Sequence, residues 1–303
     1  MADMCVNIAG IDFKNPVIAA SGTYGFGKEY NELFPLEKLG GISCKGTTLH
    51  DRSGNPPPRI AETHGGILNS VGLQNPGVDA FINESLPWLA QKDIVVIANI
   101  AGSTESDYAL AVEKLNDTAV DMVELNISCP NVKEGGVSFG SSCQSVENIT
   151  KLIRSKCQKP LIVKLTPNVS NIGEIAKSAE YAGADAISLI NTLTGMKIDI
   201  NTRRPILKNN TGGLSGPAIL PVAVRMVWEA SKCVSIPIIG MGGISTWQDA
   251  IEIMLAGACA VQIGTACFTD AFAPLKVIDG IDSFLDNNGF SCVSDIVGKV
   301  EPW

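Results

Sequence analysis

Eight short runs of apolar, largely β-branched residues recur along this 303-residue chain, with helix-like segments between them. The runs cover residues 16–20, 41–45, 94–99, 121–126, 161–165, 185–190, 236–240 and 260–264. Several are nearly continuous in apolar residues, which is typical of parallel strands covered by helices. The repeated strand-then-helix order predicts an α/β protein, and a count of eight favours a closed (β/α)8 TIM barrel over an open sheet. We expect one domain over residues 1–303, because no linker or repeat divides the chain.

Helix starts and long connections can be read between the strands. Thr104 with Asp107, Asn171 with Glu174, and Ser245 with Gln248 resemble capping boxes, in which two side chains satisfy free backbone amides. Three connections, 46–78, 127–143 and 191–216, are too long for simple turns and follow the carboxyl ends of strands. Long structureless loops are usually functional, and barrel enzymes place their chemistry on this face. We therefore expect the site there.

Composition excludes several classes of function. The net charge of -8, without any basic run, opposes nonspecific binding to nucleic acid. The longest apolar stretches have the length of a strand, far below the roughly 18 residues of a membrane span, and the first ten residues do not resemble a signal peptide. Nine cysteines without a Cys-x-x-Cys pair, and only two histidines, indicate reduced thiols in the cytoplasm and make a metal site on this chain improbable.

Polar residues stand at the ends of strands that are otherwise apolar. They are Lys45, Asn99, Asn126, Lys164 and Asn191. A packed barrel interior would not select them, so their convergence on one rim predicts a binding site. Each one alone could instead be a solvated strand terminus.

Glycines follow the last two strands, in Gly240-Met241-Gly242-Gly243 and in Gly264-Thr265. Loops at these places in barrels commonly bind phosphate through backbone amides and a helix amino terminus. No Gly-x-Gly-x-x-Gly follows a strand and opens a helix, so a mononucleotide such as FMN suits the pattern better than a dinucleotide.

A thiol occupies the loop after the fourth strand, in Asn126-Ile127-Ser128-Cys129-Pro130-Asn131-Val132. Glycines follow at Gly135 and Gly136, so a closing loop could bring Cys129 to a substrate and exclude water. A cysteine is more often a buried packing residue, and the position of Cys129 by itself leaves that alternative open.

These residues resemble the class 1 dihydroorotate dehydrogenases, and most closely the NAD-linked class 1B. The matching stretches also include Asn69-Ser70-Val71-Gly72-Leu73-Gln74-Asn75-Pro76-Gly77 and Gly212-Gly213-Leu214-Ser215-Gly216. The resemblance covers nearly the whole chain. It implies a barrel that holds FMN and oxidises dihydroorotate to orotate in pyrimidine synthesis.

The resemblance also assigns roles to matched positions. Cys129 is similar to the general base that takes the C5 proton while hydride leaves C6 for the flavin N5, and Lys164 to the lysine at the pyrimidine edge of the flavin. The implied cofactor contacts are Ser21, Lys45, Gly46, Asn99, Asn126, Lys164, Ile190, Gly216, Gly242, Gly243, Gly264 and Thr265. The implied substrate contacts are Lys45, Asn69, Ser70, Val71, Gly72, Leu73, Asn126, Asn191 and Thr192.

The subtype implies partners. Lys133-Glu134-Gly135-Gly136 and residues 213–225 resemble class 1B, whereas class 2 enzymes carry serine as the base and an amino-terminal membrane segment. Class 1B implies a homodimer of this chain joined by two subunits that carry FAD and a [2Fe–2S] cluster, through which electrons reach NAD.

Three other functions stay open from the residues. A flavin enzyme could act on another reduced pyrimidine, because the same asparagines could hold dihydrouracil. A lyase or aldolase barrel could form a Schiff base on Lys164. A noncatalytic barrel could bind a phosphorylated ligand or act as a scaffold, in which case Cys129→Ala would change no turnover.

Overall fold

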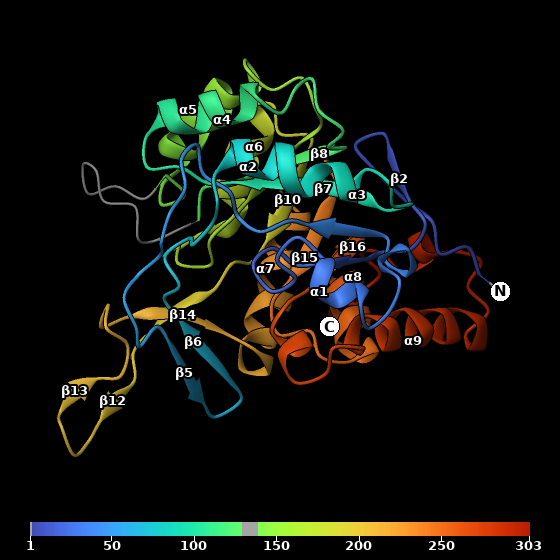
Figure 1. Ribbon diagram of the computed structural model, residues 1–303. Helices are drawn as coiled ribbons and strands as arrows, with labels where there is room; N and C mark the ends of the chain where they lie inside the picture. Colours follow the sequence, from blue (N-terminus) through green and yellow to red (C-terminus); the bar gives the residue numbers. More distant parts are fainter. Residues whose placement is uncertain (1, 129–138) are drawn as a thin grey trace.

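The computed structural model describes residues 2–128 and 139–303, and its centre is a closed barrel of parallel strands (Figure 1). The strands are hydrogen-bonded in chain order around the ring, and the last pairs with the first. They are β3 (Val17–Ala19), β4 (Gly41–Ser43), β7 (Val95–Ile100), β8 (Met122–Asn126), β9 (Leu161–Lys164), β10 (Ala186–Leu189), β15 (Ile238–Met241) and β16 (Ala260–Ile263). Each lies within one or two residues of a predicted run, so the predicted (β/α)8 barrel is confirmed.

Helices cover the outside of the barrel (Figure 1). The longer ones are α4 (Glu105–Glu113), α5 (Cys143–Arg154), α6 (Ile172–Tyr181), α7 (Leu220–Ser231), α8 (Trp247–Ala256) and α9 (Ala273–Asn287). The short segments are α1 (Lys28–Asn31), α2 (Val78–Ala80), α3 (Leu86–Leu89), the π-helix η2 (Phe81–Ser85), and the 3-10 helices η1 (Leu36–Lys38), η3 (Pro217–Ile219), η4 (Thr265–Phe268) and η5 (Val293–Asp295). Among the described residues no helix has both the length and the apolar character that crossing a bilayer requires.

One of the three predicted capping boxes is observed in full, and the N-cap half of a second is observed. Thr104 forms a capping box with Asp107, whereas at α6 the Asn171 side chain accepts from the backbone amide of Glu174 without the reciprocal bond. The third prediction was wrong by one residue, since Thr246 caps α8 and pairs with Asp249 instead of Ser245 with Gln248. Thr246 and Asp249 have the same three-residue spacing, and the carboxylate of Asp249 accepts from the backbone amides of Ser245 and Thr246.

Two of the long connections are not structureless, which corrects the sequence prediction. Residues 46–78 contain β5 (Ile60–Thr63) and β6 (Gly66–Asn69), and residues 191–216 contain β11 (Leu193–Gly195), β12 (Ile198–Asp199), β13 (Arg204–Pro205) and β14 (Gly212–Ser215). These excursions join in an antiparallel sheet of order β11-β14-β6-β5, while β12 and β13 form a hairpin (Figure 1, lower left). The sheet forms one wall of the site described below.

The opposite end of the barrel is closed by apolar side chains. The hairpin of β1 (Val6–Ile8) and β2 (Ile11–Phe13) contributes buried Ile8 and Phe13. They belong to one apolar cluster with buried residues of the barrel strands, among them Ile18, Ile97 and Met122. Burial of this end leaves the carboxyl face as the place for a ligand.

Candidate functional site

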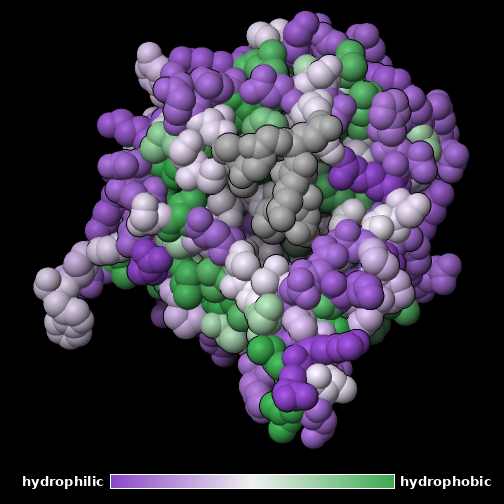
Figure 2. Space-filling model, turned by 90° about the vertical axis from the view of Figure 1, so that its left-hand side faces the viewer, coloured by the Kyte–Doolittle hydropathy of each residue, from purple (hydrophilic) through white to green (hydrophobic). Residues whose placement is uncertain are grey.

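A cavity of about 450 Å³ lies at the carboxyl ends of the barrel strands, the face onto which Figure 2 looks. The periphery of this face is mostly hydrophilic (Figure 2). The cavity is bounded by the residues that follow the barrel strands and by β6 and β14 of the side sheet. Its volume lies in the range of small-molecule and cofactor sites, roughly 300–1,000 Å³.

Nearly all of the predicted site residues line this cavity. From the cofactor set these are Ser21, Lys45, Gly46, Asn126, Lys164, Ile190, Gly216, Gly242, Gly243, Gly264 and Thr265. From the substrate set they are Asn69, Ser70, Val71, Gly72, Leu73, Asn191 and Thr192, together with the shared Lys45 and Asn126. Asn99 does not line the cavity and is only 1% exposed. Cys129 and the 133–136 stretch lie outside the described residues.

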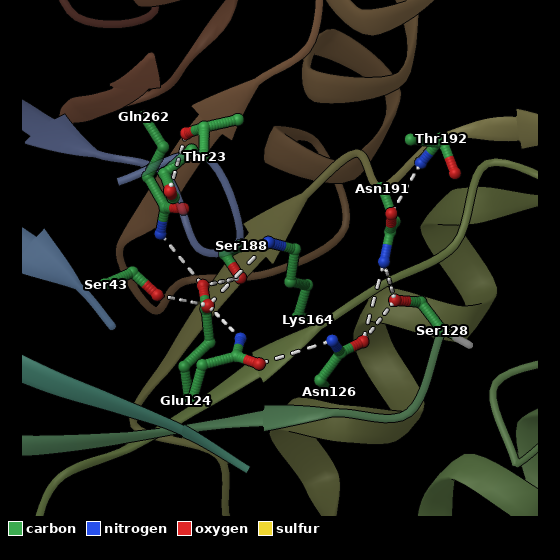
Figure 3. A network of polar contacts seen from close by, with 12 residues as sticks. Thr23, Ser43, Glu124, Asn126, Ser128, Lys164, Ser188, Asn191, Thr192 and Gln262 are labelled. Carbon is green, nitrogen blue, oxygen red and sulfur yellow. Dashed lines mark hydrogen bonds and ion pairs between the residues drawn. The ribbon is translucent and has the colours of Figure 1, made fainter. Parts of the chain in front are cut away.

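A buried carboxylate, Glu124 on β8, lies beneath the cavity at the centre of the barrel (Figure 3). Its Oε1 accepts hydrogen bonds from Ser188 Oγ at 2.7 Å and Gln262 Nε2 at 2.8 Å. Its Oε2 accepts from Ser43 Oγ at 2.8 Å and Asn99 Nδ2 at 2.5 Å. These four donors come from four different strands, so one carboxylate joins β4, β7, β10 and β16 across the barrel interior.

Lys164 forms an ion pair with this carboxylate. Its Nζ lies 3.7 Å from Glu124 Oε2, and its side chain is 6% exposed, so it is not a strand-end lysine that reaches solvent. Burial raises the pKa of Glu124, but the Lys164 charge and the hydrogen bonds from Ser188, Ser43 and Asn99 outweigh it and hold that pKa below its usual value. The floor of the cavity therefore carries a paired buried cation.

A chain of side-chain amides leads from Glu124 to the cavity wall (Figure 3). Asn126 Nδ2 donates to Asn99 Oδ1 at 3.3 Å. Asn126 Oδ1 in turn accepts from Ser128 Oγ at 2.7 Å and Asn191 Nδ2 at 3.5 Å, and Asn191 Nδ2 also donates to Ser128 Oγ at 2.5 Å. Predicted polar residues of three strand ends are thus part of one network.

Lys45 and Lys164 are the charged residues among those that line the cavity in the described part of the chain. Burial lowers the pKa of Lys45, and the positive charge of Arg59 acts in the same direction. Arg59 Nη2 donates to Gln74 Oε1 at 2.6 Å, and Gln74 directly follows residues 70–73 in the chain. A negatively charged ligand would reverse this destabilisation of the Lys45 cation.

Glycines allow the backbone to approach closely around the cavity. Gly243 has φ +81°, and a Cβ there would lie 2.6 Å from the backbone nitrogen of Leu220, near the start of α7. A Cβ at Gly213 would lie 2.0 Å from Thr192 Oγ1. After Gly264, Thr265 begins η4, whose first amides have no partner within that helix. Such amides next to glycine loops suit an anion.

Sequence reasoning missed Glu124 and Gln262. Both are charged or polar side chains inside nearly continuous apolar strands, and that contrast is the signal that could have found them. Ser43 and Ser188 occupy equivalent inward positions on their strands but are too small and too common to be noticed.

Cysteines and acidic residues form no disulfide or metal site in the described part of the chain. Eight cysteines are described there, and each is a free thiol. The described residues also contain no cluster of three or more histidine, cysteine or carboxylate side chains suited to a metal ion.

Fold and cavity together define a (β/α)8-barrel protein with a small-molecule site at the carboxyl face. Residues 3–285 match the model of the family described as dihydroorotate dehydrogenase. The chain belongs to this family, which confirms the resemblance drawn from the sequence.

Three curated relatives carry the name dihydroorotate dehydrogenase B (NAD(+)), catalytic subunit. The chain is 56% identical to the protein of Petrotoga mobilis, with 99% of this chain and 100% of the relative covered. It is 56% identical to that of Alkaliphilus oremlandii (98% and 99% covered) and 51% identical to that of Bacteroides thetaiotaomicron (99% and 100%).

A solved structure supports the fold. The structure of a dihydroorotate dehydrogenase from Eimeria tenella in complex with ferulenol matches with a TM-score of 0.81, covering 98% of this chain and 88% of the other. Sequence identity is 24%, so this likeness concerns the fold alone.

Proposed function

We propose that this chain is the FMN-binding catalytic subunit of an NAD-linked dihydroorotate dehydrogenase, which oxidises dihydroorotate to orotate. The observation that carries the proposal is the convergence of Lys45, Asn126, Lys164 and Asn191 on one cavity of cofactor size, in a chain more than half identical to proteins of that name.

The cavity wall fits a flavin mononucleotide. Gln262 Oε1 and Ser70 Oγ are buried there without a hydrogen-bond partner among the described residues, and so could accept from or donate to a ligand ring. The loops at Gly242, Gly243, Gly264 and Thr265 suit the phosphate, and Lys164 suits the edge of the ring that becomes anionic on reduction. When bound, FMN supplies a hydride acceptor for the substrate C6.

The substrate residues suit a planar anion. Amide side chains of Asn69, Asn126 and Asn191 and the backbone of residues 70–73 can orient a ring without adding charge. Lys45 is the cavity cation not paired with Glu124, so we assign it to the substrate carboxylate.

Cys129 is our candidate for the base that takes the C5 proton. The residue before it, Ser128, is 3% exposed and bonds to the side chains of Asn126 and Asn191, both of which line the cavity. The segment that carries the thiol therefore starts beside the proposed substrate contacts. A thiol has an ordinary pKa near 8.5, so a base that works at neutral pH needs a lowered pKa.

We infer that the chain works in an assembly, since its curated relatives are named catalytic subunits. A homodimer joined by two subunits carrying FAD and [2Fe–2S] would connect the barrel to NAD. We also propose one domain over residues 1–303, supported by the pairing of Asp3 with Cys292 at the two ends of the chain, and a cytoplasmic location, in keeping with the many cysteines.

The test is loading of the purified chain with FMN, followed by anaerobic addition of dihydroorotate or of dihydrouracil, which lacks the carboxylate. We expect dihydroorotate, and not dihydrouracil, to bleach the flavin. Preference for dihydrouracil would replace the substrate assignment, and failure to bind FMN would refute the proposal. Borohydride trapping of a substrate on Lys164 would instead favour a Schiff-base enzyme.

A further inference from the structure

Glu124 is a buried ionisable group that the proposed reaction leaves without a role. It is 0% exposed, does not line the cavity, and lies beneath it in the barrel interior. A carboxylate in such a place is costly unless its oxygens are fully hydrogen-bonded. Its conspicuous feature is that all four donors are neutral side chains, while Lys164 stands farther away at 3.7 Å.

An ionised carboxylate can only accept hydrogen bonds, so Glu124 dictates how its partners are turned. Asn99 must present its NH2 group to Glu124 Oε2, and its Oδ1 therefore faces Asn126. Asn126 must then present its own NH2 group to Asn99, which leaves its Oδ1 for Asn191 and Ser128. Glu124 thereby sets the amide orientation of Asn99, Asn126 and Asn191 in turn.

The same arrangement leaves the donors of Lys164 free for a ligand. Among the described residues Lys164 Nζ has no hydrogen-bond acceptor, because the four neutral donors already occupy the oxygens of Glu124. The Lys164 ammonium is thus paired electrostatically with Glu124 at the cavity floor, and its N–H groups can still donate hydrogen bonds to a ligand.

We propose that Glu124 is a positioning residue, which acts through Asn99 to fix the amide orientation of Asn126 and Asn191 and hence the hydrogen bonds offered to the substrate ring. This inference rests on the proposed function, because it takes Asn126 and Asn191 as substrate contacts. The competing explanation is that Glu124 only stabilises the barrel interior, in which case changes at Glu124 alter folding stability but not ligand affinity.

The experiment measures orotate binding to the FMN-loaded full chain through the change in the visible flavin spectrum, with FMN affinity and thermal stability recorded separately. Glu124→Leu removes both acceptor oxygens, so the amide of Asn99 is no longer held in one orientation, and we expect orotate affinity to fall by about tenfold, roughly the worth of one well-made hydrogen bond. The double variant Glu124→Leu/Asn99→Asp moves the acceptor-only group one position along the same relay. Because Asn126 must still donate to it, we expect orotate affinity to return to within about threefold of wild type.

A matched pair of variants keeps the test decisive if Glu124→Leu fails to fold. Asn99 and Ser188 are both buried, both donate to Glu124 and both lie outside the cavity lining, but Asn99 alone belongs to the relay. Asn99→Ala should weaken orotate binding in the FMN-loaded protein, whereas Ser188→Ala should leave it unchanged.

Three results would overturn the inference: wild-type orotate affinity in Glu124→Leu, equal losses in Asn99→Ala and Ser188→Ala, or no recovery in the double variant. Failure of the proposed function looks different, because the FMN-loaded wild type itself would then show no spectral response to orotate.

Discussion

Substitution Lys164→Met removes the buried cation while keeping a side chain of similar length. At 3.7 Å from Glu124 Oε2, the pair has a Coulomb energy of about 4.5 kcal/mol with an effective dielectric constant of 20. Breaking a buried pair typically costs roughly 3–5 kcal/mol, since the remaining charge stays buried. The four hydrogen bonds that remain on Glu124 soften this cost, so we expect the free energy of unfolding to fall by about 3 kcal/mol at pH 7. Urea unfolding of the FMN-free protein measures it.

The control is a closer but exposed pair. Lys276 Nζ lies 2.6 Å from Asp270 Oδ2, and the two side chains are 71% and 37% exposed. Solvent screening reduces such a pair to about 0–1 kcal/mol, so Lys276→Met should cost far less despite the shorter distance. Equal losses in the two variants would refute the argument that burial, and not distance, determines the strength of the pair.

The same variant has a defined pH dependence. In wild type the pKa of Glu124 is lowered below 4.5, so its contribution to stability is present above that pH and is lost as the pH falls through the folded-state pKa. Loss of the Lys164 charge removes the first of the causes that lower this pKa, so the pKa of Glu124 is higher in the variant than in wild type and the variant has less stability to lose on acidification. The difference between the two proteins should therefore narrow toward pH 4. A constant difference would show that Glu124 is not the ionised partner.

Two further changes test the cavity. Burial and the charge of Arg59 lower the pKa of Lys45 from 10.5, so on raising the pH the cation is lost, and orotate affinity falls, before pH 10.5 is reached. Lys45→Arg should keep its affinity to higher pH. Parallel curves for the two proteins in an orotate titration would contradict the assignment of Lys45 to the carboxylate. Gly243→Ala should lower the free energy of unfolding by about 1–3 kcal/mol and weaken FMN binding, because the new Cβ would lie 2.6 Å from the Leu220 backbone. Gly289→Ala, at φ +74° with nothing within 4 Å, controls for backbone strain alone. Calorimetry and FMN titration measure both variants, and equal losses of stability and FMN affinity would refute the steric argument.

The barrel was predictable because its strands carry their own signal. Nearly continuous apolar runs such as 161–165 indicate parallel strands without knowledge of their partners. The side sheet could not be predicted in this way, since β6 and β14 are short, rich in glycine and paired across the chain, with Asn69 opposite Gly213. Register between such distant segments depends on tertiary contacts that local pattern does not contain.

The strand-end residues that line the site were predictable, and the carboxylate beneath them was not. Lys45, Asn126, Lys164 and Asn191 stand out because polar side chains at the ends of apolar strands converge in a barrel. Glu124 is a charged residue in an apolar strand, but its role could not be predicted, because that role depends on donors from four strands that only the closed barrel brings together. The expectation that Asn99 contacts the cofactor stays a prediction, although its side chain bonds to Glu124 below the cavity.

The most direct test of the account is the rate at which dihydroorotate bleaches the flavin of the FMN-loaded protein in anaerobic rapid mixing at neutral pH. We predict that Cys129→Ser slows this rate by about 10²–10⁴-fold, the usual contribution of a general base, while Cys143→Ser leaves it unchanged. An undiminished rate in Cys129→Ser would contradict the claim that this thiol removes the proton opposite the flavin.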